Sequence, residues 1–180
     1  NSTKIIVIGY SRGSEAALLT ASSDPQVNAV AVFSPSSVAW GALGSTDPTG
    51  KSGWSLQGRP VPFLVPTNEQ SGVEVFRSSL ARVPRHNPAR IPVERIRGPI
   101  LLVASDGDGI WPSGAMARQI AKELDASAFR YNVTLLVFNH ASHRLLGIGP
   151  SPPIQTYKSP DQTRVINFGG TPDGTEAARN

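Results

Sequence analysis

Residues 4–19 read KIIVIGYSRGSEAALL, and this stretch decides the fold. Residues 5–8 are apolar and β-branched, which is typical of a strand buried on both faces in a parallel sheet. Residues 16–19 are alanine and leucine, which favour a helix. The residues between them, Gly9 to Gly13, begin and end with glycine and predict a sharp turn. We therefore expect a strand, a turn and a helix (residues 15–21) in immediate succession.

The same alternation of strands and helices continues along the chain. Short apolar runs predict further strands, and a stripe of apolar residues after Pro112 predicts another helix. The expected strands cover residues 29–33, 100–104 and 133–138, and the expected helix covers residues 113–125. Buried strands that alternate with helices predict an α/β fold, with a mainly parallel sheet and flanking helices.

Residues 34–97 interrupt this pattern. They are rich in Pro, Gly and Ser, and they contain Trp40 and Trp54. Such a composition between two regular segments is typical of loops. We interpret the segment as a long, lid-like excursion from the sheet, with one helix near residues 73–83.

Both ends of the chain have the pattern of a fragment. The first residues already belong to a strand, at 4–8. After a Pro-rich tail from Gly147 and a short apolar pair at 165–166, the last residues begin a helix near Thr175. A length of 180 residues suits one domain. We therefore expect residues 1–180 to be one partial domain, truncated at both ends.

Composition argues against several classes of function. The chain is 39% hydrophobic and 17% charged, as in a globular domain, and no apolar run approaches the roughly 20 residues of a membrane span. The net charge is +4, and six of the 13 arginines lie within residues 77–97, interleaved with prolines and not with aromatics, so a nucleic-acid partner is not expected. Cysteine is absent and no zinc-binding histidine motif occurs, so no metal is expected. The sequence does not specify a compartment, and a cytoplasmic location is only the default.

The pentapeptide Gly9-Tyr10-Ser11-Arg12-Gly13 has the G-x-S-x-G pattern of a nucleophilic serine. Glycines on both sides remove side chains that a sharp strand-to-helix turn would not accommodate, and the N–H of Arg12 can donate to an oxyanion. The pattern alone is weakly specific, but its place between an apolar strand and a helix supports the nucleophile hypothesis. The structural alternative is a turn in which Ser11 caps the helix.

A serine nucleophile needs a base, and the base needs a carboxylate that orients it. Asp106 and Asp108 follow the third expected strand, and His140 and His143 follow the fourth. The carboxyl ends of parallel strands are where α/β proteins place their sites. We favour Asp108 as the acid and His143 as the base. Asp106 is then a turn residue, His140 packs at the strand end, and His86 is a surface residue.

Several segments resemble the C-terminal catalytic domain of the acyl-CoA thioester hydrolase and bile acid-CoA:amino acid N-acyltransferase family. They are residues 8–18 (IGYSRGSEAAL), 54–62 (WSLQGRPVP), 91–113 (IPVERIRGPILLVASDGDGIWPS), 138–145 (FNHASHRL) and 167–172 (NFGGTP). The resemblance spans nearly the whole chain. It implies an α/β-hydrolase fold, with Ser11 at the nucleophile position, Asp108 at the acid position and His143 at the base position.

The resemblance also implies an enzyme that hydrolyses acyl-CoA thioesters. The family's N-acyltransferases carry cysteine at the nucleophile position, so Ser11 favours the thioesterase branch. The alternatives are an ester or lactone hydrolase, an acyl-CoA N-acyltransferase, and a non-catalytic fragment or pseudoenzyme. No cofactor is expected beyond the coenzyme A of the substrate. The arginines at 77–97 are expected either to bind its phosphates or to be solvated lid residues.

Overall fold

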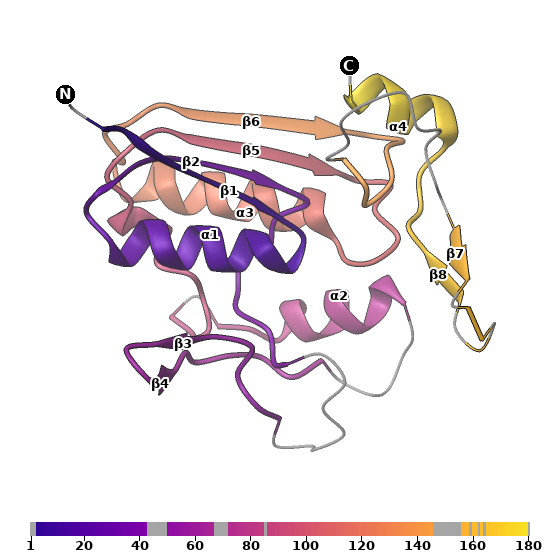
Figure 1. Ribbon diagram of the computed structural model, residues 1–180, viewed down its shortest axis with the longest axis horizontal. Coiled ribbons are helices and arrows are strands. Elements are labelled where there is room, and N and C mark those ends of the chain that lie inside the picture. Colours follow the sequence, from indigo (N-terminus) through magenta and orange to yellow (C-terminus); the bar gives the residue numbers. More distant parts are fainter. Residues whose placement is uncertain are drawn as a thin grey trace.

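The computed structural model describes residues 3–42, 50–66, 72–84, 86–145, 156–158, 160–161, 163 and 165–179. Helices and strands alternate along the chain as the sequence predicts (Figure 1). The longer elements are β1 (Ile5–Tyr10), α1 (Arg12–Ser23), β2 (Val27–Phe33), α2 (Val73–Ala81), β5 (Ile100–Ser105), α3 (Ser113–Ala126), β6 (Val133–Phe138) and α4 (Pro172–Arg179). The shorter ones are β3 (Ser55–Leu56), β4 (Arg59–Pro60), the 3-10 helix η1 (Val93–Arg95), β7 (Thr156–Lys158) and β8 (Val165–Asn167).

Four parallel strands form the central sheet, in the order β1-β2-β5-β6. The register pairs Tyr10 with Phe33 and Phe33 with Val103, so the carboxyl ends of β1, β2 and β5 lie together. Helices α1 and α3 pack on one face of this sheet, and α2 and the β3–β4 hairpin lie beyond them (Figure 1). The predicted α/β fold with a mainly parallel sheet and flanking helices is confirmed.

The main hydrophobic core lies between the sheet and helices α1 and α3. The inner strands contribute Val32 and Leu102, and the helices contribute Leu18, Ile120 and Leu124, all fully or almost fully buried. Burying one such side chain stabilises a fold by about 1.5–3 kcal/mol. This packing fixes the end of β1 against the start of α1, where the G-x-S-x-G motif lies.

Strand β1 differs from its prediction. It lies at the edge of the sheet, and Ile6 and Ile8 are 62% and 63% exposed. Because side chains alternate along a strand, Ile6 and Ile8 point away from α1, whereas Val7 packs against the main core. The prediction of a strand buried on both faces is therefore wrong for β1 in the described structure. A run of apolar residues does not reveal which element covers each face.

The described parts of residues 34–97 lie outside the four-stranded sheet, and their apolar side chains join Trp111 and Met116 in a second hydrophobic cluster. Within it, Trp40 meets Phe76 edge-on at 4.9 Å, and Phe76 meets Trp111 in the same way at 5.9 Å. Helix α2 confirms the predicted helix. Residues 43–49, 67–71 and 85 of the excursion lie outside the described residues, as do 147–155 of the Pro-rich tail.

The β3–β4 hairpin was not predicted. Its two turn residues, Gln57 and Gly58, both have positive φ, at 52° and 76°. Tight hairpins favour such turns, because the turn then twists in the same sense as the strands. Each strand has only two residues, so no alternating pattern marks it in the sequence.

The two glycines of the motif are predicted to differ in their effect on stability. A Cβ on Gly9 would overlap the carbonyl of Gly13 and lie 2.7 Å from the Cβ of Ala17, whereas a Cβ on Gly13 would meet nothing within 4 Å. Gly9→Ala should therefore lower the free energy of unfolding by about 1–3 kcal/mol, as overpacking does. Gly13→Ala, inside α1, should leave it unchanged or raise it by up to about 1 kcal/mol. Urea denaturation of both variants checks this, and equal losses would contradict it.

Candidate active site

Ser11 lies at the turn between β1 and α1 in a strained backbone conformation, with φ 54° and ψ −126°. A residue with a Cβ keeps such angles only where its neighbours hold the chain. The N–H of Ser11 donates to the carbonyl of Phe33 at 3.0 Å, and its own carbonyl accepts from the N–H and the hydroxyl of Ser14 at 2.9 and 2.6 Å. The Ser11 hydroxyl makes no capping bond to α1, so the helix-cap alternative is wrong.

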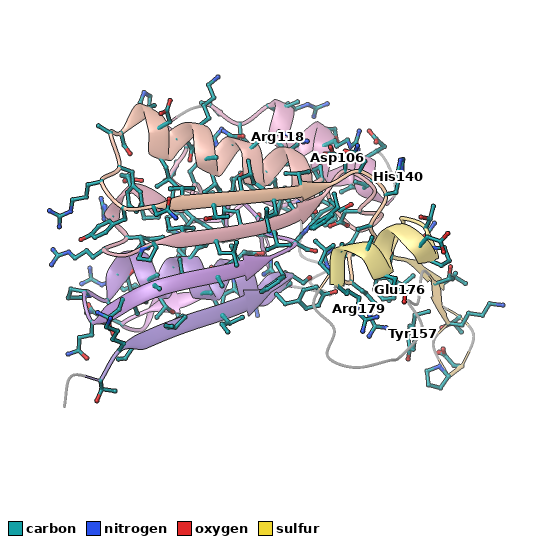
Figure 2. The ribbon with its side chains drawn as sticks, turned by 90° about the horizontal axis from the view of Figure 1, so that it is seen from above. Asp106, Arg118, His140, Tyr157, Glu176 and Arg179 are labelled. Carbon is teal, nitrogen blue, oxygen red and sulfur yellow. The ribbon has the colours of Figure 1, made fainter. Side chains whose placement is uncertain are left out.

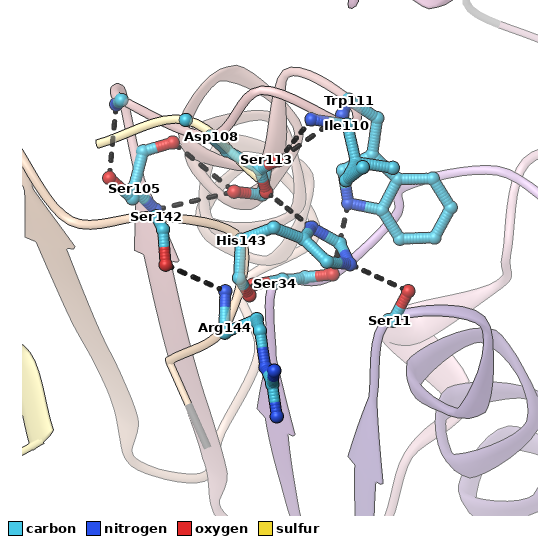
Figure 3. Close-up of polar contacts among 12 residues, drawn as sticks. Ser11, Ser34, Ser105, Asp108, Ile110, Trp111, Ser113, Ser142, His143 and Arg144 are labelled. Atoms are coloured by element: carbon cyan, nitrogen blue, oxygen red, sulfur yellow. Dashed lines mark hydrogen bonds and ion pairs between the residues drawn. The ribbon is translucent and has the colours of Figure 1, made fainter. Parts of the chain in front are cut away.

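The hydroxyl of Ser11 instead meets His143, and His143 meets Asp108 (Figure 3). Ser11 Oγ lies 2.7 Å from His143 Nε2, and His143 Nδ1 lies 2.8 Å from Asp108 Oδ2. The side chains of His143 and Asp108 are 4% and 0% exposed. The structure thus brings together the three residues that the sequence favoured.

The two oxygens of the Asp108 carboxylate accept hydrogen bonds from different groups, one from the backbone of its own loop and the other from His143. Its Oδ1 accepts from the backbone N–H groups of Ile110 at 2.9 Å and Trp111 at 3.2 Å. An ionised carboxylate can only accept, so Nδ1 of His143 must be the donor to Oδ2. In a neutral imidazole, Nε2 is then free to accept a proton from Ser11.

A short segment before α4, residues 167–170, ties the acid and histidine loops together. The carbonyl of Phe168 accepts from the N–H of Gly109 at 3.0 Å and from that of His143 at 2.7 Å. Gly169 and Gly170 have positive φ values of 73° and 67°, and a Cβ on either would overlap the backbone of one of these loops. In the sequence this segment stands out only for its resemblance to the family. The Gly169-Gly170 pair is the signal from which its tight packing could have been inferred.

Ser34, directly after β2, was also missed. Its hydroxyl donates to the carbonyl of His143 at 2.6 Å, and its carbonyl accepts from the indole N–H of Trp111 at 3.2 Å. Its own N–H donates to the carbonyl of Val103 at 2.8 Å. Ser34 therefore connects the acid and histidine loops to the inner strands. A single buried serine in the sequence gives no sign of contacts 77 and 109 residues away.

Aromatic rings surround the imidazole of His143. Trp111 approaches it edge-on at 5.6 Å, Tyr10 lies tilted at 5.3 Å, and Phe168 stacks at 6.5 Å. Burial raises the pKa of Tyr10 to about 12, so its phenol stays neutral at physiological pH. The rings restrict the orientation of the imidazole, and the Asp108 carboxylate beside it is fully buried.

The competing candidates lie elsewhere. Asp106 is on the surface, where Arg118 donates two hydrogen bonds to its carboxylate, both at 2.7 Å (Figure 2). These bonds hold the pKa of Asp106 below its ordinary value. His140 is exposed, so the expectation that it packs at the strand end is wrong (Figure 2). His86 is exposed, as predicted.

The arginines of residues 77–97 do not gather at one site. Arg90 is paired with Glu123 at 3.0 Å and, with Arg95, lines a hollow of about 890 Å³ beside the last turn of α1. Arg95 and Arg97 also line a hollow with Asp24 and Pro25, at the end of α1 that is remote from Ser11. Arg77 instead shares a hollow with Asp106 at the carboxyl end of β5. Arg85 lies outside the described residues.

Arg12 opens α1, so its N–H is one of the first helix amides, which have no acceptor within the helix. Its side chain turns to Glu15, one turn further along, at 2.7 Å. The Glu15 carboxylate also accepts from the backbone N–H of Trp40 at 3.0 Å and from the indole N–H of Trp54 at 2.9 Å. Burial raises the pKa of Glu15 from 4.5 to about 7, and these donors offset part of the rise.

In the described part of the chain, no helix is both long enough and apolar enough to span a bilayer. No three histidine, aspartate or glutamate side chains in that part come together as a metal site would require.

A family match covers nearly the whole chain. The family described as BAAT / Acyl-CoA thioester hydrolase C terminal matches residues 1–179. Among curated proteins, no significant match was found. The matched family is the one that the motifs around Ser11, Asp108 and His143 resemble, so the resemblance seen in the sequence is confirmed.

We predict that Glu15 makes stability depend on pH. The native state binds the Glu15 proton more tightly than the unfolded chain, because the native pKa is about 7 and the ordinary value is 4.5. The stabilisation is therefore complete below pH 4.5 and is lost as the pH rises to about 7. A shift of this size corresponds to roughly 3 kcal/mol.

The measurement is urea denaturation of the wild type and of Glu15→Gln between pH 4.5 and 8. The free energy of unfolding of the wild type should fall relative to that of the variant across this range. Glu74→Gln is the matched control, since Glu74 is likewise paired with an arginine three residues away, Arg77, but both side chains are half exposed. Parallel curves for the wild type and Glu15→Gln would contradict the prediction.

Proposed function

The chain belongs to the BAAT / acyl-CoA thioester hydrolase C-terminal family, and we propose that it hydrolyses acyl-CoA thioesters with Ser11 as the nucleophile. Membership supports acyl-CoA thioester hydrolysis or acyl transfer in general. The finer assignment rests on one observation, the unbroken hydrogen-bond chain from Asp108 through His143 to Ser11. Chemistry that needs an activated serine uses this arrangement.

In the proposed acylation step, Ser11 Oγ attacks the thioester carbonyl carbon while His143 Nε2 takes its proton. Asp108 stabilises the imidazolium that forms and keeps the ring oriented. The negative charge on the carbonyl oxygen is met by the N–H of Arg12 at the start of α1, where the helix dipole is also favourable. When the C–S bond breaks, His143 returns the proton to the sulfur, and coenzyme A leaves as the thiol.

Deacylation repeats these steps with water. His143 removes a proton from a water molecule, the hydroxide adds to the acyl-Ser11 ester, and the same N–H of Arg12 stabilises the oxyanion. When the tetrahedral intermediate collapses, the C–O bond to Ser11 breaks and Ser11 Oγ recovers its proton from His143. The products are a carboxylic acid and the free enzyme, so one thioester bond is hydrolysed in each cycle.

Serine favours hydrolysis over transfer to an amine. A serine ester is less reactive toward amines than a cysteine thioester, and water is the more abundant acceptor. The same triad would also hydrolyse an oxygen ester or a lactone, which is the second candidate function. Paired kinetics on an acyl-CoA and on a p-nitrophenyl ester of the same acyl group separate the two. A higher kcat/KM on the thioester supports the first.

Coenzyme A carries phosphates, and two arginines lie where they could meet them. Arg144 follows His143 directly, is exposed, and lies over the ring of Phe168 at 5.5 Å. Arg77 lies beside the carboxyl end of β5. Arginine suits phosphate because its planar guanidinium donates paired hydrogen bonds. Arg95, at the far end of α1, is not proposed to take part.

Variants of the proposed triad should lose turnover, and their sequence neighbours should keep it. We expect Ser11→Ala, His143→Ala and Asp108→Asn each to lower kcat by about 10⁴-fold, the scale of triad losses. The matched controls Asp106→Asn and His140→Ala should change kcat by less than about 3-fold, because both residues are on the surface. Steady-state hydrolysis of an acyl-CoA by folded variants measures this. Loss of turnover in His140→Ala with retention in His143→Ala would refute the assignment.

Removing a phosphate-binding arginine should raise KM for acyl-CoA but not for a thioester that lacks phosphate groups. For Arg144→Ala and Arg77→Ala we expect a rise of about 3- to 10-fold at low salt, the range of a partly exposed ionic contact, and a smaller rise at high salt. A thioester that lacks the nucleotide should show no change. Arg95→Ala is the control and should match the wild type with both substrates. Equal effects on the charged and uncharged thioesters would disprove the phosphate role.

A further inference from the structure

The carboxylate of Glu15 is fully buried and has no part in the proposed mechanism. A buried carboxylate is costly unless hydrogen-bond donors satisfy it. Three donors reach this one, and they come from two places in the chain. Arg12 belongs to α1 itself, whereas the N–H groups of Trp40 and Trp54 belong to the excursion.

The guanidinium of Arg12 makes the complementary contacts. Its Nη1 donates to Glu15, while its Nη2 donates to the carbonyls of Trp40 at 3.0 Å and Gly41 at 3.1 Å. It also lies 5.7 Å from the ring centroid of Trp54, within the range of a cation–π contact. A Cβ on Gly53 would overlap Nη2 and lie 3.0 Å from the carbonyl of Trp40, so a larger residue there would displace the guanidinium. Together, Arg12 and Glu15 bind residues 40–41 and 53–54 to the first turn of α1.

The backbone of Arg12 is next to the chemistry. Its N–H is the proposed oxyanion donor, and it belongs to the peptide that joins Arg12 to the strained Ser11. Strained conformations persist only when surrounding contacts determine them, and a displacement of about 1 Å can cost roughly 100-fold in rate. The side chain of the same residue, Arg12, is held mainly by the excursion, through Trp40, Gly41 and Trp54.

We infer that Arg12 and Glu15 are positioning residues, through which docking of residues 40–41 and 53–54 on α1 sets the direction of the oxyanion donor. This inference rests on the proposed function of Ser11. It assigns the excursion a role in the acyl-transfer steps, although none of these residues touches the reacting atoms. Undocking of Trp54 then leaves Ser11, His143 and Asp108 in place but misdirects the Arg12 amide.

Glu15→Gln tests the inference most cleanly. Glutamine keeps one oxygen to accept the tryptophan N–H groups, but it places an NH₂ group against the guanidinium of Arg12. With a saturating acyl-CoA we expect kcat to fall about 10- to 100-fold and KM to change less than about 3-fold. Glu94→Gln is the control, because it removes an exposed glutamate paired with Arg95, which has no proposed role, and should leave both constants unchanged.

Two further readouts separate positioning from a loss of folded protein. Labelling of Ser11 by a small fluorophosphonate should slow by the same factor as kcat, because its phosphoryl oxygen uses the same donor. Fluorescence of folded Glu15→Gln should report a more solvated Trp54, with a matched Trp54→Phe variant identifying that signal. Trp54→Phe itself removes only the indole donor and should lower kcat about 3- to 10-fold. If Glu15→Gln does not fold, the Trp54→Phe variant still tests the inference.

The outcomes distinguish this inference from the proposed function. A wild type that hydrolyses acyl-CoA, together with folded Glu15→Gln and Trp54→Phe variants of unchanged kcat, overturns the positioning role alone. A loss of turnover that merely equals the loss of folded protein overturns it as well. A folded wild type that neither hydrolyses esters nor reacts with the fluorophosphonate contradicts both proposals.

Discussion

The hydrogen-bond chain from Asp108 through His143 to Ser11 joins three loops that are far apart in the sequence, and several unusual backbone conformations lie around it. The loops meet because parallel strands place their carboxyl ends at one edge of the sheet. Ser34 and residues 167–170 then fix the acid and histidine loops to within hydrogen-bond distance. Positive φ at Ser11 and Ser34 is the conformational cost of this convergence, whereas Gly169 and Gly170 adopt positive φ without steric strain.

A second set of polar contacts lies in the first turn of α1, directly after the nucleophile. Glu15 and Arg12 form hydrogen bonds with the excursion, so the first turn of α1 is tied to Trp40, Gly41 and Trp54. The excursion is thus part of the framework of the site as well as a cover over the helices. A buried ion pair of this kind contributes little net stability, but it specifies one arrangement strongly, because breaking either half leaves a buried charge unpaired.

Much of the fold was predictable because its signals are local. The apolar run before Gly9 and the alanines after Gly13 marked a strand and a helix, and the glycine-bracketed Ser11 marked the turn between them. The neighbours that cover each element in three dimensions are not encoded in the local sequence. The exposure of Ile6 and Ile8 depends on β1 lying at the sheet edge, and the β3–β4 hairpin has strands too short for any pattern.

The site was predictable to the level of residue types and order. Asp108 and His143 were preferred over Asp106 and His140, but only the three-dimensional structure reveals that Asp106 pairs with Arg118 on the surface. The roles of Ser34 and Glu15 depend on partners far away in the chain. No property of a lone serine or of a helical glutamate records such contacts, because they form only when the sheet and the excursion come together.

The central claim is that Ser11 carries the acyl group during turnover. The most direct test is to mix the chain with a long-chain acyl-CoA, quench it in acid within the first turnovers, and identify the acylated peptide by mass spectrometry. We expect an acyl increment on the peptide that contains Ser11, absent from Ser11→Ala and from samples left until the substrate is exhausted. Continued hydrolysis with no adduct, or an adduct on another residue, would contradict it.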